Sequence, residues 1–95
     1  MFQVTVYKML YAAGIRFKAR QEMVMMKLEL PFAPFVGLTI SNGAAATTAS
    51  GFLKQVTWNT ETKEFETYAE DEEHIAESLF DVRLQAHLQG GWSKG

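Results

Sequence analysis

Apolar and polar residues alternate with a period of two in several segments, and this alternation constrains the fold more than any other feature of the sequence. The pattern covers residues 2–10, returns at 24–30 and resumes at 36–40. In the first segment one face of an extended chain carries Phe2, Val4, Val6 and Leu10. Strands with one apolar face bury it against another layer, so the chain requires a sheet that is covered on one side.

Residues 15–20 alternate in the opposite phase to residues 24–30. The apolar positions of the earlier segment are odd-numbered and those of the later segment are even-numbered. A strand that keeps one face buried absorbs such a change only through a bulge or a tight turn. We therefore predict a bulge or turn at residues 21–23.

Two prolines interrupt the alternation between residues 30 and 36. Pro31 and Pro34 have no amide hydrogen, and each biases the preceding residue towards an extended conformation. The segment is predicted to cross between two strands in a polyproline-like conformation, with Phe32 and Phe35 pinning it to the core. The small residues at 44–50 predict a mobile loop.

Residues 52–70 have the pattern of a β-hairpin. Pairing Trp58 with Phe65 and Val56 with Thr67 places five apolar residues on one face, and a shift by one residue loses this. They are Phe52, Val56, Trp58, Phe65 and Ala69. The other face then carries acidic residues at positions 64, 66 and 70. Six basic and two acidic residues lie in 1–54, whereas three basic and nine acidic residues lie in 55–95. We expect the acidic face to lie beside a basic strand that carries Arg16, Lys18 and Arg20.

A single helix is predicted to begin at Asp71 and to end at Gly90. Asp71 suits the N-cap, and the acidic residues after it complement the helix dipole. At about 100° per residue the helix has two apolar stripes. The first stripe is expected to pack on the sheet and contains Ile75, Leu79, Val82 and Ala86. The second is a candidate contact surface, unless Trp92 folds back over it, and contains Phe80, Leu84 and Leu88.

These elements predict one α+β domain over residues 1–95. Its sheet is a curved antiparallel sheet of about five strands, open or half-barrel, with one C-terminal helix packed across it. A chain of 95 residues fills only one core. The absence of cysteine excludes disulfides, thiol nucleophiles and cysteine metal sites. The first residues lack the pattern of a leader or a membrane span, so a cytoplasmic protein is expected.

Motifs for catalysis, cofactors or metal ions do not stand out in the sequence. His74 and His87 are 13 residues apart, which is about 20 Å along a helix and too far for one metal ion. Neither a nucleophile elbow nor a phosphate-binding loop occurs. We therefore expect no metal, no cofactor and no membrane partner, and the sequence gives no support to an enzymatic activity.

The function expected from these observations is that of a binding module that acts as a homo-oligomer. A short chain with this much apolar surface favours a second copy as the partner. The expected contact residues are Phe32, Phe35, Phe80, Leu84 and Leu88.

Two alternatives stay open. Single-stranded nucleic acid or phosphate could bind along Arg16, Lys18 and Arg20, although an isoelectric point near 5.6 disfavours this. A small apolar molecule could bind in a pocket between sheet and helix. The expected pocket residues are Met26, Phe32, Phe35 and Trp58.

Overall fold

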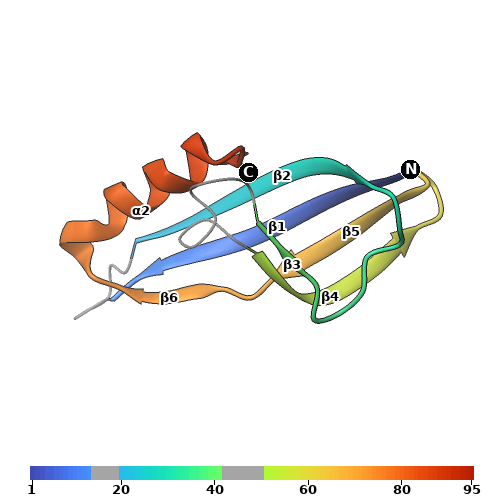
Figure 1. Ribbon diagram of the computed structural model, residues 1–95. Helices are drawn as coiled ribbons and strands as arrows, with labels where there is room; N and C mark the ends of the chain where they lie inside the picture. The colour runs from blue at the N-terminus through green and yellow to red at the C-terminus, as the bar shows by residue number, and fades with distance from the viewer. Residues whose placement is uncertain (14–19, 42–50) are drawn as a thin grey trace.

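The computed structural model describes residues 1–13, 20–41 and 51–95 and shows a curled mixed sheet with a helix across one end (Figure 1). The predicted α+β class, with a half-barrel sheet and a C-terminal helix, is confirmed. The described elements are β1 (Phe2–Ala12), β2 (Gln21–Leu30), β3 (Thr39–Ile40), β4 (Gly51–Asn59), β5 (Glu64–Ala69), β6 (Glu72–Ile75), α2 (Glu77–Gln89) and β7 (Ser93–Lys94).

Strand β1 lies in the interior of the sheet, whose order is β3, β4, β5, β1, β2, β7. It runs antiparallel to β2 but parallel to β5 and to β6, which pairs with β1 beyond the end of β5. The β1–β2 hairpin occupies one edge of β1, and the β4–β5 hairpin brings β5 back along the other edge in the direction of β1. Most of the sheet is therefore antiparallel, as predicted, and the pairings of β1 with β5 and β6 make it mixed.

The β1–β2 hairpin keeps one register along its whole described length. Met9 lies opposite Met23, and Leu10 lies opposite Glu22, with no shift between these pairs. The predicted bulge or turn at 21–23 is therefore wrong. The opposite-phase strand at 15–19 and the loop at 44–50 lie outside the described residues. The expected contact between a basic strand and β5 is also wrong, because β4 and β1 occupy both edges of β5.

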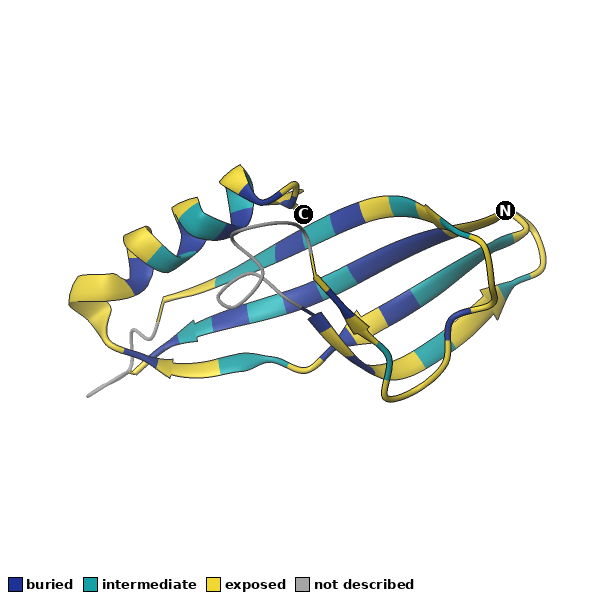
Figure 2. Ribbon diagram, in the orientation of Figure 1, coloured by how far each residue is buried: buried dark blue, intermediate teal, exposed yellow. Residues whose placement is uncertain are grey.

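The core lies between the concave face of the sheet and α2 (Figure 2). Even-numbered side chains of β1 and β2 point into it, because successive residues of a strand face opposite sides. Its buried apolar residues are Val4, Val6, Leu10, Ala12, Val24, Met26, Ile40, Leu53, Ala69, Ile75, Phe80, Leu84 and Trp92.

The helix begins later than predicted, and its two apolar stripes are exchanged. Residues 72–75 form β6, so Asp71 caps no helix; Ala76 occupies the N-cap position, without a side-chain hydrogen bond. Phe80 and Leu84 are buried, and Leu88 packs against the core, whereas Leu79 and Val82 are 53% and 62% exposed. Ile75, predicted for the first stripe, belongs to β6 and not to the helix, and it is buried there. The predicted contact surface at Phe80, Leu84 and Leu88 is therefore wrong.

The proline segment crosses from β2 to β3 as predicted, but backbone hydrogen bonds rather than phenylalanines hold it. The Gly37 amide donates to the Leu53 carbonyl, and the Leu53 amide donates to the Leu38 carbonyl. Phe32 and Phe35 are 44% and 54% exposed, with ring centroids 6.3 Å apart. Their predicted insertion into the core is wrong.

The β4–β5 hairpin has the predicted register, with Trp58 opposite Phe65 and Val56 opposite Thr67. A register shift between Leu53 and Gln55 changes the face of the strand at that point. Leu53 is consequently buried, and Phe52, predicted to face inward, is exposed.

Candidate functional site

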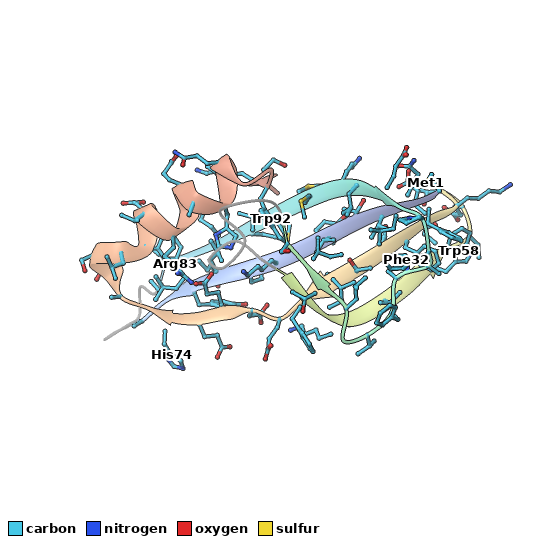
Figure 3. The ribbon with its side chains drawn as sticks, in the orientation of Figure 1. Met1, Phe32, Trp58, His74, Arg83 and Trp92 are labelled. Carbon is cyan, nitrogen blue, oxygen red and sulfur yellow. The ribbon has the colours of Figure 1, made fainter. Side chains whose placement is uncertain are left out.

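Four ionisable side chains from three elements meet between α2 and the sheet, and we call them the ionic cluster: Lys8, Glu72, Arg83 and His87. Lys8 comes from the core face of β1, and Glu72 comes from β6. Arg83 and His87 lie one helical turn apart on α2. Figure 3 shows Arg83 at the helical end of the molecule, far from Trp58.

The hydrogen bonds of the ionic cluster define the tautomer of His87. His87 Nδ1 lies 2.7 Å from the carbonyl oxygen of Arg83. Because a carbonyl only accepts, Nδ1 carries the ring hydrogen of neutral His87. Nε2 then accepts from Lys8 Nζ at 3.0 Å. Glu72 Oε1 pairs with the Arg83 guanidinium, and Glu72 Oε2 lies 3.6 Å from Lys8 Nζ.

Burial changes the protonation of the two basic side chains that lie deepest. His87 is fully buried and Lys8 nearly so. Burial, with a smaller contribution from the Arg83 charge, lowers the pKa of Lys8 to about 8. Burial also lowers the pKa of His87; the charges of Lys8 and Arg83 act in the same direction, and the hydrogen bond to the Arg83 carbonyl opposes them. At neutral pH, neutral His87 therefore sits beside charged Lys8.

A bulge in β6 directs Glu72 into the ionic cluster. Leu10 pairs with Glu72 and Ala12 pairs with Ile75. Between these pairs β6 therefore has one more residue than β1. His74 has a φ of 59°, a left-handed conformation that is uncommon for residues other than glycine. The extra residue lets Glu72 and Ile75 both point inward.

A surface cavity of about 360 Å³ opens between β6 and the start of α2. Glu72, Arg83 and His74 line it, but Lys8 and His87 do not. A ligand in this cavity would meet the carboxylate and the guanidinium, while the lysine and the imidazole lie behind them. In residues 1–13, 20–41 and 51–95, no group of three or more acidic, histidine or cysteine side chains could hold a metal ion.

Five aromatic side chains gather at the other end of the sheet, and we call them the aromatic patch: Phe2, Phe32, Phe35, Trp58 and Phe65. Strand register brings Phe2, Phe65 and Trp58 together, since Phe2 lies opposite Leu30, Val4 beside Phe65, and Phe65 opposite Trp58. Phe32 and Phe35 lie in the segment that follows β2, with their rings near each other. The Phe65 ring contacts Phe2 at 5.8 Å and Trp58 at 4.7 Å between centroids. Met1, Phe32 and Trp58 are labelled at this end in Figure 3.

Most of the aromatic patch is accessible. Trp58 is 47% exposed, Phe2 is 39% exposed, and Phe32 and Phe35 are exposed to a similar degree. The helix lies at the opposite end of the sheet and does not cover them (Figure 1). Large aromatic side chains this exposed can contribute much to binding when a partner covers them.

Arg20 alone of the residues predicted for nucleic acid is described, and Met26 lies apart from the other residues predicted for a pocket. Arg16 and Lys18 lie outside the described residues. The Arg20 guanidinium is 2.9 Å from Asp81 Oδ1 and lies over the Phe80 ring, so it is engaged with α2. Met26 is buried in the core, whereas the other predicted pocket residues, Phe32, Phe35 and Trp58, lie at the surface.

The ionic cluster was missed in the sequence, although one signal for it is present. In the series Val4, Val6, Lys8 and Leu10, the lysine occupies an inward position of the alternating strand. A lysine is rarely buried unless it is paired, so this position calls for an internal partner. The partner was hidden because the segment with Glu72 has the composition of a helix start.

Comparison with known families gives no matching family model, and neither curated proteins nor solved structures show significant similarity to the chain. Within the part of the chain that the structure describes, none of the helical segments is long and apolar enough to cross a membrane. Arguments about function therefore start from the residues of this chain alone.

Proposed function

We propose that the protein is a non-enzymatic binding module of the cytoplasm that acts as a homo-oligomer, with the aromatic patch as part of its contact surface. The observation that carries the proposal is the exposure of Phe2, Phe32, Phe35 and Trp58 on adjoining elements at the end of the sheet that α2 leaves uncovered. Contiguous exposed apolar surface is typical of an interaction site.

The composition of the aromatic patch supports an interface with another protein. Aromatic residues are enriched in the centres of interfaces, where they bury much area at a small cost in side-chain entropy. The patch contains no charged residue that a partner would have to desolvate. A second copy is the simplest partner, because it presents the same apolar surface in return.

The ionic cluster supports a structural role better than a catalytic one. Lys8 and His87 have lowered pKa values, but they are buried and hydrogen-bonded to each other. Their contacts join β1 and β6 to α2. Nucleic-acid binding and a small-molecule pocket stay as the alternatives, and the pairing of Arg20 with Asp81 reduces the support for the first.

The proposal is tested by the solution mass of matched variants. Phe32→Ser with Phe35→Ser removes half-exposed aromatic rings that contribute little to the core. Leu79→Ser with Val82→Ser is the control, since these side chains are equally exposed on α2. Light scattering should show an oligomer for the unmodified chain and the control, and a smaller species for the first variant. A monomeric unmodified chain would refute the proposal.

A further inference from the structure

Among the described residues, no strand pairs with the outer edge of β2 at Lys27 or Glu29. Strand β7 pairs with β2 only at Val24 and Met25. In the described ranges no strand pairs with the outer edge of β2 beyond that point, and Figure 1 shows this half of β2 at the margin of the sheet. An open edge presents unpaired backbone donors and acceptors and is a template for another strand.

The phase of the hydrogen bonds shows which backbone groups point outward from this edge. The Gly95 amide donates to the Met23 carbonyl at 2.9 Å, and Ser93 Oγ approaches the Met25 carbonyl at 3.4 Å. The backbone amides and carbonyls of the odd-numbered residues of β2 therefore point away from β1. Since β2 keeps one register with β1 throughout, the same orientation holds for Lys27 and Glu29.

The sequence of this edge is complementary to itself. Residues 26–30 read Met-Lys-Leu-Glu-Leu, in which polarity is symmetric about Leu28 and the charges on its two sides are opposite. When two such strands pair antiparallel with Leu28 facing Leu28, Lys27 of each copy faces Glu29 of the other. Both residues are exposed, and opposite charges in facing positions stabilise a strand pair.

We propose that two copies of this chain join through antiparallel pairing of their β2 strands about a two-fold axis at Leu28. This inference rests on the proposed function, because it requires that the protein is a homo-oligomer. Lys27 and Glu29 form the hydrogen-bonded positions of the new ladder. Each amide donates to the carbonyl of its counterpart, which gives four backbone hydrogen bonds and two ion pairs.

The neighbours of the edge fit this register. In it, Pro31 falls opposite Met25 of the second copy, where β7 is already paired. Pro31 has no amide to donate and ends β2, so the ladder stops where β7 begins. Gln3 Nε2 donates to Glu29 Oε1 at 2.6 Å, which holds the carboxylate on the sheet face to which Lys27 of the second copy also points.

The open edge adjoins the aromatic patch. Phe32 follows β2 by two residues, and Phe2 lies opposite Leu30 at the end of the strand. Pairing of the β2 strands would therefore bring part of the aromatic patch close to the second copy. The apolar contact and the strand ladder thus belong to one continuous surface.

A cysteine at the axis tests the register directly, since the chain has no cysteine of its own. Facing residues at Leu28 would have Cα atoms about 4.5 Å apart, inside the range of about 4.4 to 6.8 Å for a disulfide. Leu28→Cys should therefore form a cross-linked dimer under mild oxidation. Lys27→Cys is the matched control: its two copies would lie about 8 Å apart, too far to bond, although residue 27 is more exposed.

A charge exchange tests the same pairing without altering the core. Lys27→Glu and Glu29→Lys each place like charges opposite one another, and each should raise the dissociation constant about tenfold or more. An equimolar mixture of the two variants should form a heterodimer as tight as the unmodified dimer, because both ion pairs return.

The outcomes separate this inference from the proposed function. A monomeric unmodified chain would overturn both. An oligomer that cross-links no faster through Leu28→Cys than through Lys27→Cys, or one that is indifferent to the charge exchange, would overturn the β2 pairing and leave the proposed function standing. If Leu28→Cys fails to fold, as judged by circular dichroism, the charge exchange decides.

Discussion

Replacing Glu72 with glutamine should destabilise the fold more than any other single loss of charge in the described residues. Glu72 is the carboxylate that contacts Lys8, Arg83 and His87. Glu72→Gln keeps the size of the side chain but leaves two cations, Lys8 and Arg83, close together in a poorly hydrated place. Their repulsion already contributes to the lowered pKa of Lys8.

The expected loss follows from the burial of the cluster. Removing one partner of a buried ion pair costs about 3 to 5 kcal/mol, because the remaining charge stays desolvated. A domain of this size has a free energy of unfolding of about 5 to 14 kcal/mol. Since a loss of about 1 kcal/mol lowers the thermal midpoint of a domain of this size by about 4 to 8 °C, the thermal midpoint should fall by on the order of 20 °C.

The assay is urea unfolding followed by circular dichroism at pH 7 and at pH 10. At pH 10 Lys8 is neutral, because its folded-state pKa is about 8. The loss in Glu72→Gln should therefore be smaller at pH 10 than at pH 7. Glu61→Gln, on the exposed hairpin loop, is the control and should change stability by no more than about 0.5 kcal/mol. A loss below about 1 kcal/mol at pH 7, or one that is equal at both pH values, would refute this reasoning.

Three further expectations concern separate parts of the fold. Burial lowers the pKa of His87 in the folded state, so as the pH drops the unfolded chain binds a proton at this residue before the folded chain does. The free energy of unfolding should therefore fall as the pH drops through about 6.5. Denaturant titrations of His87→Gln at several pH values should lack this part of the decline. Phe80→Ala should cost about 3 to 5 kcal/mol and Val82→Ala less than about 0.5 kcal/mol in urea unfolding, and the reverse order would show that the other stripe packs on the sheet. Lys63 has a φ of 57° in the β4–β5 loop, so Lys63→Gly should raise the free energy of unfolding by about 1 kcal/mol. A lower free energy of unfolding would show that the conformation carries no strain.

Strand pairing was predictable from the sequence where alternation and local contacts agree. The β4–β5 register follows from the facing apolar pairs, and the helix ends at Gly90 as its position after the last apolar turn indicates. The class of the fold follows from alternating segments that precede one helical segment. These features depend on residues close together in the chain.

Features that depend on distant residues were not predictable. The strand β6 forms because residues 72–75 pair with the free part of β1, more than 60 positions away, and the bulge at His74 removes any alternation that would signal it. The choice between two apolar helix stripes depends on which side chains fill the space above β1 and β2. The ionic cluster depends on both β6 and the buried helix stripe. A lysine at an inward position of β1 could therefore be recognised in the sequence as unusual, but its partners could not.

The central claim is that two or more copies of this chain associate, and sedimentation equilibrium of the unmodified chain tests it most directly. Measurement over about a hundredfold range of concentration distinguishes a reversible association, whose average mass changes with concentration, from a species of constant mass. We expect a mass near twice the 10.7 kDa of the chain, or a larger multiple, that falls towards 10.7 kDa on dilution. A mass of 10.7 kDa at every concentration would contradict the claim.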